Sequence, residues 1–162
     1  MGDGCQHEHI PGGLGADGLA RALAAADRRC EVEGERMTAS RRRVLGLLLE
    51  AGEPVKAYDL IARFGAEGQA AKPPTVYRAL EFLERRGMAH RIASISAYVA
   101  CTDASDQGHA AAFLICDCCG AAREVAVGSA VGVSEAAAQA GYVIERTTIE
   151  AHGRCPACRS VS

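Results

Sequence analysis

The sequence predicts an α+β protein, with an N-terminal winged helix-turn-helix followed by a small C-terminal α/β unit. In the N-terminal part, apolar residues recur at helical spacing in successive segments, and two short strand-like segments around a polar turn follow them. In the C-terminal part, strand-like segments flank an alanine-rich helix, and two C-x-x-C pairs supply the ligand spacing of a four-cysteine zinc site.

Polar and glycine-rich segments predict the domain limits. Residues 1–17 are rich in glycine, histidine and polar residues, so we expect a flexible tail there. A winged-helix domain is expected over 18–101. The polar segment 102–108 (TDASDQG) predicts a hinge, and an α/β domain with the two cysteine pairs follows over 109–162.

The winged-helix elements follow from periodicity and end signals. Leucines at helical spacing predict a helix over about 18–32. Thr38 is the expected N-cap of a second helix to about 51, which Gly52-Glu53-Pro54 stops. A third helix is expected over 57–65, where Tyr58 can share a face with Ile61 and Phe64. A turn is expected over 65–72.

A fourth helix is expected over 73–86, because proline suits the first helical turn and Gly87 can close the last. Its periodicity leaves Tyr77, Arg78, Glu81 and Arg85 on or near the outer side. Residues 88–93 and 97–101 flank a short polar turn and predict a two-stranded hairpin. Three helices and such a hairpin make a winged helix-turn-helix.

The C-terminal unit is expected to contain strands at 110–116, 122–127 and 142–151 and a helix at 129–140. With about 60 residues its core is marginal. We therefore expect a metal or an oligomer interface to support it.

Composition narrows the function classes. The chain has 162 residues, 49% of them hydrophobic, and a net charge of −2, which excludes a disordered or collagen-like protein. Because positive and negative charges nearly balance, nucleic-acid binding must rest on local clusters. The longest apolar runs are far below the roughly 20 residues of a membrane helix. No signal-peptide pattern is visible, so we expect a cytoplasmic protein without a membrane partner.

The eight cysteines are the unusual feature of the composition. In a reducing compartment they favour metal ligation and buried thiols over disulfides. The two pairs predict a structural zinc site of Cys116, Cys119, Cys155 and Cys158. Buried apolar cysteines and a redox C-x-x-C are the alternatives. Cys118 competes with Cys119, because C-x-C is also a chelating turn.

A second constellation consists of His90, Cys101, His109 and Glu124. Imidazole and thiolate ligands favour zinc over magnesium or calcium. These residues lie on both sides of the predicted hinge, so one ion could fix how the domains are oriented. The simpler interpretation is that each is an ordinary surface or core residue. We assign no metal to the tail residues Cys5, His7 and His9; Cys30 is expected to be a buried thiol, and His152 a structural hydrogen-bonding residue.

Four motifs occur in a fixed order: 72–80 (KPPTVYRAL), 98–101 (YVAC), His109 with 114–116 (LIC), and 150–155 (EAHGRC). Together they resemble the ferric uptake regulator superfamily, and more specifically its zinc uptake regulator branch, over about residues 18–159. The His-His-Asp-His run typical of the iron-sensing branch is absent. Residues 38–41 read Thr-Ala-Ser-Arg where relatives commonly carry Thr-Pro-Gln-Arg.

The resemblance implies a homodimeric, zinc-responsive repressor of zinc-uptake genes with two zinc ions per subunit. The structural ion falls on the two cysteine pairs, and the regulatory ion falls on the second constellation, where it would favour the operator-binding dimer. The alternatives are an iron- or peroxide-sensing regulator of the same superfamily and a zinc hydrolase with Glu124 as its base. Four protein ligands leave no open position for a catalytic water, so we expect neither an enzyme nor a small-molecule substrate.

On this resemblance the fourth helix enters the major groove of double-stranded DNA. Arg78 can bind a guanine edge and Tyr77 a thymine methyl. Thr75 and Tyr58 are further candidates, and Arg41 can bind a phosphate. A solvated helix surface is the alternative for Tyr77, Arg78 and Arg41, and core packing is the alternative for Tyr58. A symmetric dimer implies a palindromic operator.

Overall fold

The computed structural model describes residues 12–65, 72–101, 111–127, 131–145 and 147–159. They divide into two compact units, and the division falls after Cys101. The expected hinge, most of the expected tail and the expected turn before the fourth helix lie outside the described residues. Among the helices that are described, none is long and apolar enough to cross a membrane.

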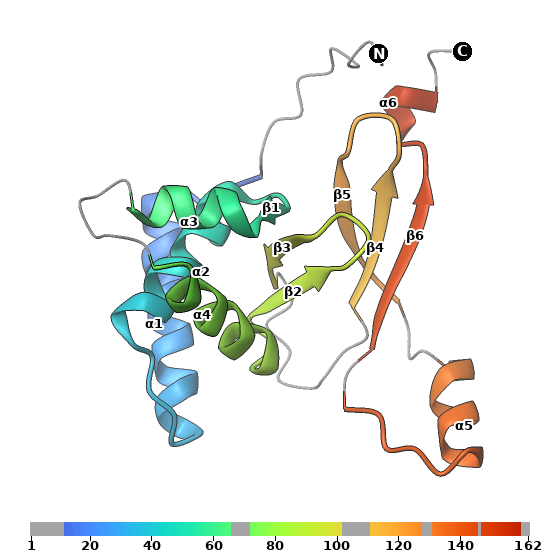
Figure 1. Cartoon of the computed structure of the whole chain (residues 1–162), viewed down its shortest axis with the longest axis horizontal. Coiled ribbons are helices and arrows are strands. Elements are labelled where there is room, and N and C mark those ends of the chain that lie inside the picture. The colour runs from blue at the N-terminus through green and yellow to red at the C-terminus, as the bar shows by residue number, and fades with distance from the viewer. Residues whose placement is uncertain (1–11, 66–71, 102–110, 128–130, 146, 160–162) are drawn as a thin grey trace. The chain divides into compact units, whose positions relative to one another are not determined.

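The first unit is a winged helix, as the sequence predicts (Figure 1). Its helices are α1 (Ala16–Val32), α2 (Ala39–Ala51), α3 (Ala57–Gly65) and α4 (Pro73–Arg85). Its strands are β1 (Val55–Lys56), β2 (Ala89–Ile92) and β3 (Ala97–Ala100), which form one sheet in the order β1-β3-β2.

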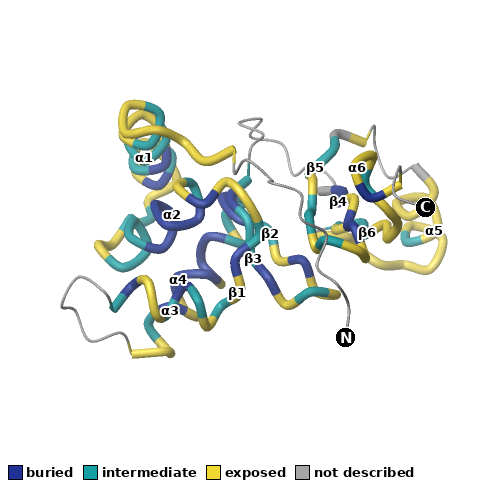
Figure 2. The backbone as a smooth tube through the Cα atoms, turned by 90° about the horizontal axis from the view of Figure 1, so that it is seen from above, coloured by how far each residue is buried: buried dark blue, intermediate teal, exposed yellow. Residues whose placement is uncertain are grey.

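The core of the first unit lies mainly between α2 and α4, where the chain is most deeply buried (Figure 2). Val44 and Leu48 of α2 and Val76 and Leu83 of α4 are fully buried. Each such side chain stabilises the fold by roughly 1.5–3 kcal/mol relative to an exposed position. Burial of one side of α4 leaves its other side free for a partner.

The helix ends use the predicted signals. The Thr38 side chain accepts a hydrogen bond from the Arg41 backbone N–H at 3.4 Å. Gly52 (φ 60°) and Gly87 (φ 63°) adopt the left-handed conformation that glycine tolerates. After α4, the Met88 N–H donates to the Leu83 carbonyl at 2.8 Å, which closes the helix and starts the wing.

The predicted hairpin is confirmed, since β2 and β3 pair in antiparallel order from Ala89–Ala100 to Ile92–Ala97. The sequence did not predict β1, which adds a third strand to the wing through the antiparallel pairs Val55–Tyr98 and Lys56–Ala97. The predicted tail extends too far, since Ala16 and Asp17 already form the first turn of α1.

Ion pairs tie the connection after α1 to the end of α4. Arg86 donates to Glu33 at 2.9 Å and also to Glu35. The guanidinium of Arg41, from α2, lies 3.5 Å from the ring centroid of Phe82, a buried residue of α4. These contacts hold α4 from outside the apolar core.

The second unit contains β4 (Ala111–Cys116), β5 (Ala122–Ala126), α5 (Val131–Gln139), β6 (Thr148–Gly153) and α6 (Pro156–Arg159). Its sheet has the order β5-β4-β6 (Figure 1). β4 is antiparallel to β5 and parallel to β6.

The last strand was predicted to begin at residue 142, and this is wrong. Tyr142 and Val143 are 75% and 90% exposed, and β6 starts only at Thr148. An aromatic and a β-branched residue favour a strand here, but β6 pairs with β4 only from Thr148 onward. The short α6 was not predicted.

Candidate metal centres and nucleic-acid interface

The first cysteine pair lies where β4 ends in a tight turn. The Cys116 N–H donates to the Ala121 carbonyl at 2.8 Å, and the Gly120 N–H donates to the Cys116 carbonyl at 2.9 Å. Gly120 has φ 75°, a conformation that glycine adopts without strain. The turn therefore brings the chain back within four residues and places Cys119 beside Cys116.

The second pair reaches the same place through the parallel pairing of β4 and β6. Cys116 lies opposite Gly153 in the register, and the Asp117 N–H donates to the Gly153 carbonyl at 2.8 Å. Cys155 follows two residues later, and its carbonyl accepts from the Arg159 N–H at 2.9 Å. The helical turn of α6 then returns Cys158 toward Cys155.

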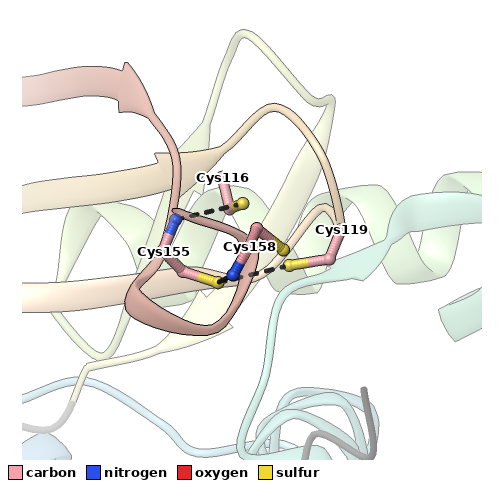
Figure 3. A group of neighbouring side chains, drawn as sticks. All are labelled: Cys116, Cys119, Cys155 and Cys158. Atoms are coloured by element: carbon pink, nitrogen blue, oxygen red, sulfur yellow. Dashed lines mark hydrogen bonds between the residues drawn. The ribbon is translucent and has the colours of Figure 1, made fainter. Parts of the chain in front are cut away.

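The four sulfur atoms of Cys116, Cys119, Cys155 and Cys158 all lie within 4.8 Å of one another (Figure 3). The Cys119 and Cys155 sulfurs are 3.9 Å apart. A Zn–S bond of about 2.3 Å requires about 3.8 Å between sulfurs at the corners of a tetrahedron. The four-cysteine set therefore fits a tetrahedral zinc ion.

The thiols of this set differ in acidity. Backbone amides, that of Cys119 foremost and that of Cys155 next, lower the pKa of Cys116 to about 6. The Cys155 N–H lies 3.3 Å from the Cys116 sulfur. Burial, followed by contacts with neighbouring sulfurs, raises the pKa of Cys158. The set thus holds one stable thiolate, and a cation is needed before all four sulfurs can ionise together.

The neighbouring polar residues have other roles. Cys118 is exposed and lies outside the four-cysteine set. Of the two cysteines that the sequence left open, the structure brings Cys119 together with the other three. The His152 Nδ1 lies 2.9 Å from an Asp117 carboxylate oxygen, so His152 makes the expected hydrogen bond. Sequence reasoning did not find Asp117, because only the β4–β6 register brings the two residues together.

The second constellation is divided between the units. His90 lies on β2 of the first unit and Cys101 directly follows β3, and one ring nitrogen of His90 lies within 4.8 Å of the Cys101 sulfur. The Cys101 N–H donates to the Met88 carbonyl at 3.0 Å, which fixes the backbone there. Glu124 lies on β5 of the second unit, with a half-buried side chain. His109 lies outside the described residues.

The outer side of α4 carries the predicted nucleic-acid residues. The Thr75 N–H donates to the Lys72 carbonyl at 2.8 Å as the helix begins, and Thr75 is half-buried. Tyr77 is 50% exposed, and Arg78 is exposed beside it. The structure therefore presents Tyr77 and Arg78 to solvent on one face, while the apolar face of the same helix is buried.

The two candidates outside α4, Tyr58 and Arg41, differ in how exposed their side chains are and in the contacts they make. Tyr58, at the start of α3, is 66% exposed, so the expectation that it shares the buried face of Phe64 is wrong. Arg41 is half-buried, stacks on Phe82, and donates to the Arg36 carbonyl. Tyr58 is available to a partner, whereas Arg41 is partly used inside the unit.

Comparison with known proteins shows the family of the chain. The model of the ferric uptake regulator family matches residues 32–152. The chain belongs to the ferric uptake regulator family.

Several similar members of this family are zinc regulators. The "Zinc uptake regulation protein" of Escherichia coli (strain K12) is 38% identical over 140 residues, which cover 86% of this chain and 82% of that protein. A solved structure, "Zinc Uptake Regulator Complexed With Zinc AND DNA", is 38% identical with a TM-score of 0.77 and covers 88% of this chain and 96% of its own. The "holo XcZur" crystal structure is 41% identical with a TM-score of 0.73 and covers 86% and 97%.

Proposed function

We propose that this member of the ferric uptake regulator family is a zinc-responsive, DNA-binding transcriptional repressor of zinc-uptake genes that acts as a homodimer in the cytoplasm. One observation carries the proposal: nearly the whole chain matches a regulator solved with zinc and DNA, at 38% identity. The function is regulation of transcription and not catalysis.

The four-cysteine set is the proposed structural zinc site. A zinc ion bound there supplies a cross-link between the end of β4 and the segment after β6. Cys116 offers a ready thiolate, and the other three cysteines lie at distances that suit a tetrahedron. Because all four positions are taken by sulfur, the site leaves no place for a catalytic water.

The proposed regulatory site consists of His90, Cys101, His109 and Glu124, which makes two zinc ions per subunit. The proximity of His90 and Cys101 in the first unit supports this site. The cysteine supports it too, because a ligand set that contains sulfur suits zinc better than a set of nitrogen and oxygen ligands alone. The ligands come from both units, so their shared ion favours the arrangement in which all of them can bind.

Typical coupling free energies between two binding sites limit how strongly zinc at this site can change DNA affinity. Coupling energies between sites are typically about 1–3 kcal/mol, and a shift from 1:99 to 99:1 needs about 5.5 kcal/mol. A dimer has two regulatory sites, whose biases add. We therefore propose that zinc excess shifts the dimer to its operator-binding form by the sum of two moderate preferences.

α4 is the proposed recognition helix in the major groove. Its exposed Arg78 offers the guanidinium fork that binds guanine, and the ring of Tyr77 suits a thymine methyl. Thr75 and Tyr58 are proposed to support base and backbone contacts. The phosphate contact of Arg41 stays a prediction. One N–H of its guanidinium donates to the Arg36 carbonyl, so the other N–H groups would have to bind the phosphate.

Dimerisation is supported by apolar surface on the second unit. In the described part of the second unit, six large hydrophobic residues are exposed: Leu114, Val127, Val133, Tyr142, Val143 and Ile144. They lie on β4, on α5 and in the segments after β5 and α5, and a homodimer interface, which is more apolar than the rest of a protein surface, would bury such side chains. A symmetric dimer presents two α4 helices, which predicts a palindromic operator.

The experiment that tests the proposal is a gel shift with DNA selected from a random pool by the zinc-loaded protein. We expect specific binding with zinc, weaker binding with a mild chelator, and no restoration by iron(II). Cys101→Ser should keep one zinc per chain and lose the response, while Cys118→Ser, which alters an exposed cysteine outside both sets, should behave as the wild type. Operator affinity that ignores zinc, measured with the four-cysteine site full, would refute the sensor.

A further inference from the structure

The exposed face of α4 carries a negative charge that the proposed recognition chemistry does not use. Glu81 is exposed and lies three residues after Arg78 and four before Arg85. Residues at these spacings are neighbours on a helix surface. The carboxylate therefore lies on the same face as the two arginines, one turn beyond Tyr77 and Arg78.

Neither arginine neutralises this carboxylate. Glu81 forms no hydrogen bond or ion pair with any residue that the structure describes, although a glutamate four residues before an arginine is the favourable order for a helical ion pair. The Arg85 guanidinium instead lies 5.8 Å from the ring centroid of Phe82. Glu81 therefore stands without a described side-chain partner on the surface that would face DNA.

A bare carboxylate in a DNA groove is repelled by phosphates unless it meets a hydrogen-bond donor. In the major groove the amino group of cytosine, N4–H₂, is the donor that glutamate accepts from, just as guanine is the partner of arginine. Along an α-helix, three residues advance about 4.5 Å. One base-pair step is about 3.4 Å. Arg78 and Glu81 are therefore spaced to read base pairs one or two steps apart.

We propose that Glu81 is a specificity-determining residue that accepts a hydrogen bond from a cytosine one or two base pairs from the guanine bound by Arg78. This inference rests on the proposed function, with α4 in the major groove. A carboxylate placed there favours the correct sequence and also penalises every site that lacks the cytosine, because its charge then stays unpaired. Glu81 thereby lowers non-specific binding, while Arg78 raises binding to the operator.

The test is selection of binding sequences from a random duplex pool by the zinc-loaded full chain, with wild type, Glu81→Ala, Glu81→Gln and Arg78→Ala compared. Wild type should select a guanine that Arg78→Ala relaxes and a nearby cytosine that Glu81→Ala relaxes. The lost discrimination at that cytosine should be between about 5-fold and 150-fold. Glu81→Gln should shift the preference toward adenine, which glutamine binds through N6 and N7. Glu31→Gln, which removes a charge from an exposed position of α1, should select the wild-type sequence.

The outcomes separate this inference from the function beneath it. If wild type selects a palindrome, and both Glu81 variants bind every duplex more tightly with an unchanged preference, Glu81 only repels DNA and the inference is wrong. If wild type selects no sequence at any zinc concentration, the proposed function itself fails, before any variant is compared.

Discussion

Replacing Cys155 by serine tests whether the second unit depends on its metal. Cys155 lies 3.9 Å from the Cys119 sulfur, its N–H donates to the Cys116 sulfur, and its own sulfur accepts from the Cys158 N–H at 3.4 Å. Serine is a good residue at the start of a helical turn, so its hydroxyl can keep the contact to Cys158. The substitution therefore removes one proposed zinc ligand and little else.

The size of the effect follows from the topology. Cys119 and Cys155 are 36 positions apart, and a cross-link that closes a loop of this length stabilises a fold by about 4 kcal/mol through chain entropy. This gain is part of the whole apparent binding free energy of structural zinc in small domains, which is about 10–16 kcal/mol at pH 7. In the described part of the second unit the large buried apolar side chains are Phe113 and Ile115, which together supply roughly 3–6 kcal/mol. The metal therefore contributes more than this core.

If the four ligands share the zinc binding free energy of about 10–16 kcal/mol equally, loss of one ligand should weaken zinc binding by about two to three orders of magnitude. Hydrogen exchange read by mass spectrometry measures the consequence for each unit. In Cys155→Ser, and in wild type treated with a strong chelator, amides of β4 and β6 should lose protection while those of α2 and α4 keep it. Cys118→Ser is the matched control, because it makes the same chemical change at an exposed cysteine outside the set. It should exchange as wild type does.

The native mass of the protein gives a second reading, because the exposed apolar surface proposed for dimerisation belongs to the second unit. Cys155→Ser should run as a monomer or as an aggregate. If it keeps both the protection of β4 and the dimer mass without zinc, then the four-cysteine set is not a structural zinc site and the estimate above is wrong.

Three further predictions concern DNA and pH. Arg78→Ala should weaken operator binding by roughly 1–3 kcal/mol and leave random duplex binding nearly unchanged, and an equal loss on both would make Arg78 a phosphate contact. Arg41→Ala should lower the slope of log affinity against log salt by about one; an unchanged slope with a lower melting temperature would assign it to Phe82 alone. Zinc affinity at the four-cysteine set should rise from pH 6.5 to 8.5 by about two or more logarithmic units per pH unit in a competition with a chelator dye. The pKa values of Cys119 and Cys158 are raised, so these thiols must release protons, whereas Cys116, with a pKa of about 6, is already a thiolate. A slope near zero would contradict this.

Local signals predicted the winged helix well because its helix ends are encoded within a few residues. Thr38 caps α2, and Gly52 and Gly87 take the left-handed conformation after α2 and α4, as their positions suggest. The third wing strand was missed because a strand of two residues has no period, and only its pairing with Tyr98 and Ala97 defines it. The sequence does contain a signal for α6, since Pro156 occupies the first helical position.

The second unit was harder to predict because its pairing is non-local. Residues 142–151 look like one strand by composition, yet only Thr148 and its successors find β4 as a partner. The four-cysteine set was predictable from spacing, since each pair needs only one tight turn. The choice between Cys118 and Cys119 needed the β4–β6 register, which decides which sulfur faces Cys155.

The parallel pairing of β4 and β6 also links the metal to operator affinity without any contact between the structural site and DNA. A parallel pair needs a long crossover, and here the crossover contains α5 and the exposed residues Tyr142–Ile144 that are proposed to dimerise. The metal joins the start of this crossover, at Cys116 and Cys119, to the segment that follows β6, at Cys155 and Cys158. Releasing it loosens the β4–β6 pair that holds the crossover in place, so the dimer surface is lost with it. A monomer offers only one α4 to a palindrome, and half of the binding free energy of a complex with a Kd near 1 nM corresponds to a Kd of roughly 30 µM. Loss of zinc at the four-cysteine set should therefore abolish repression completely, whereas loss at the regulatory set should leave a dimer that binds the operator more weakly and no longer responds to zinc.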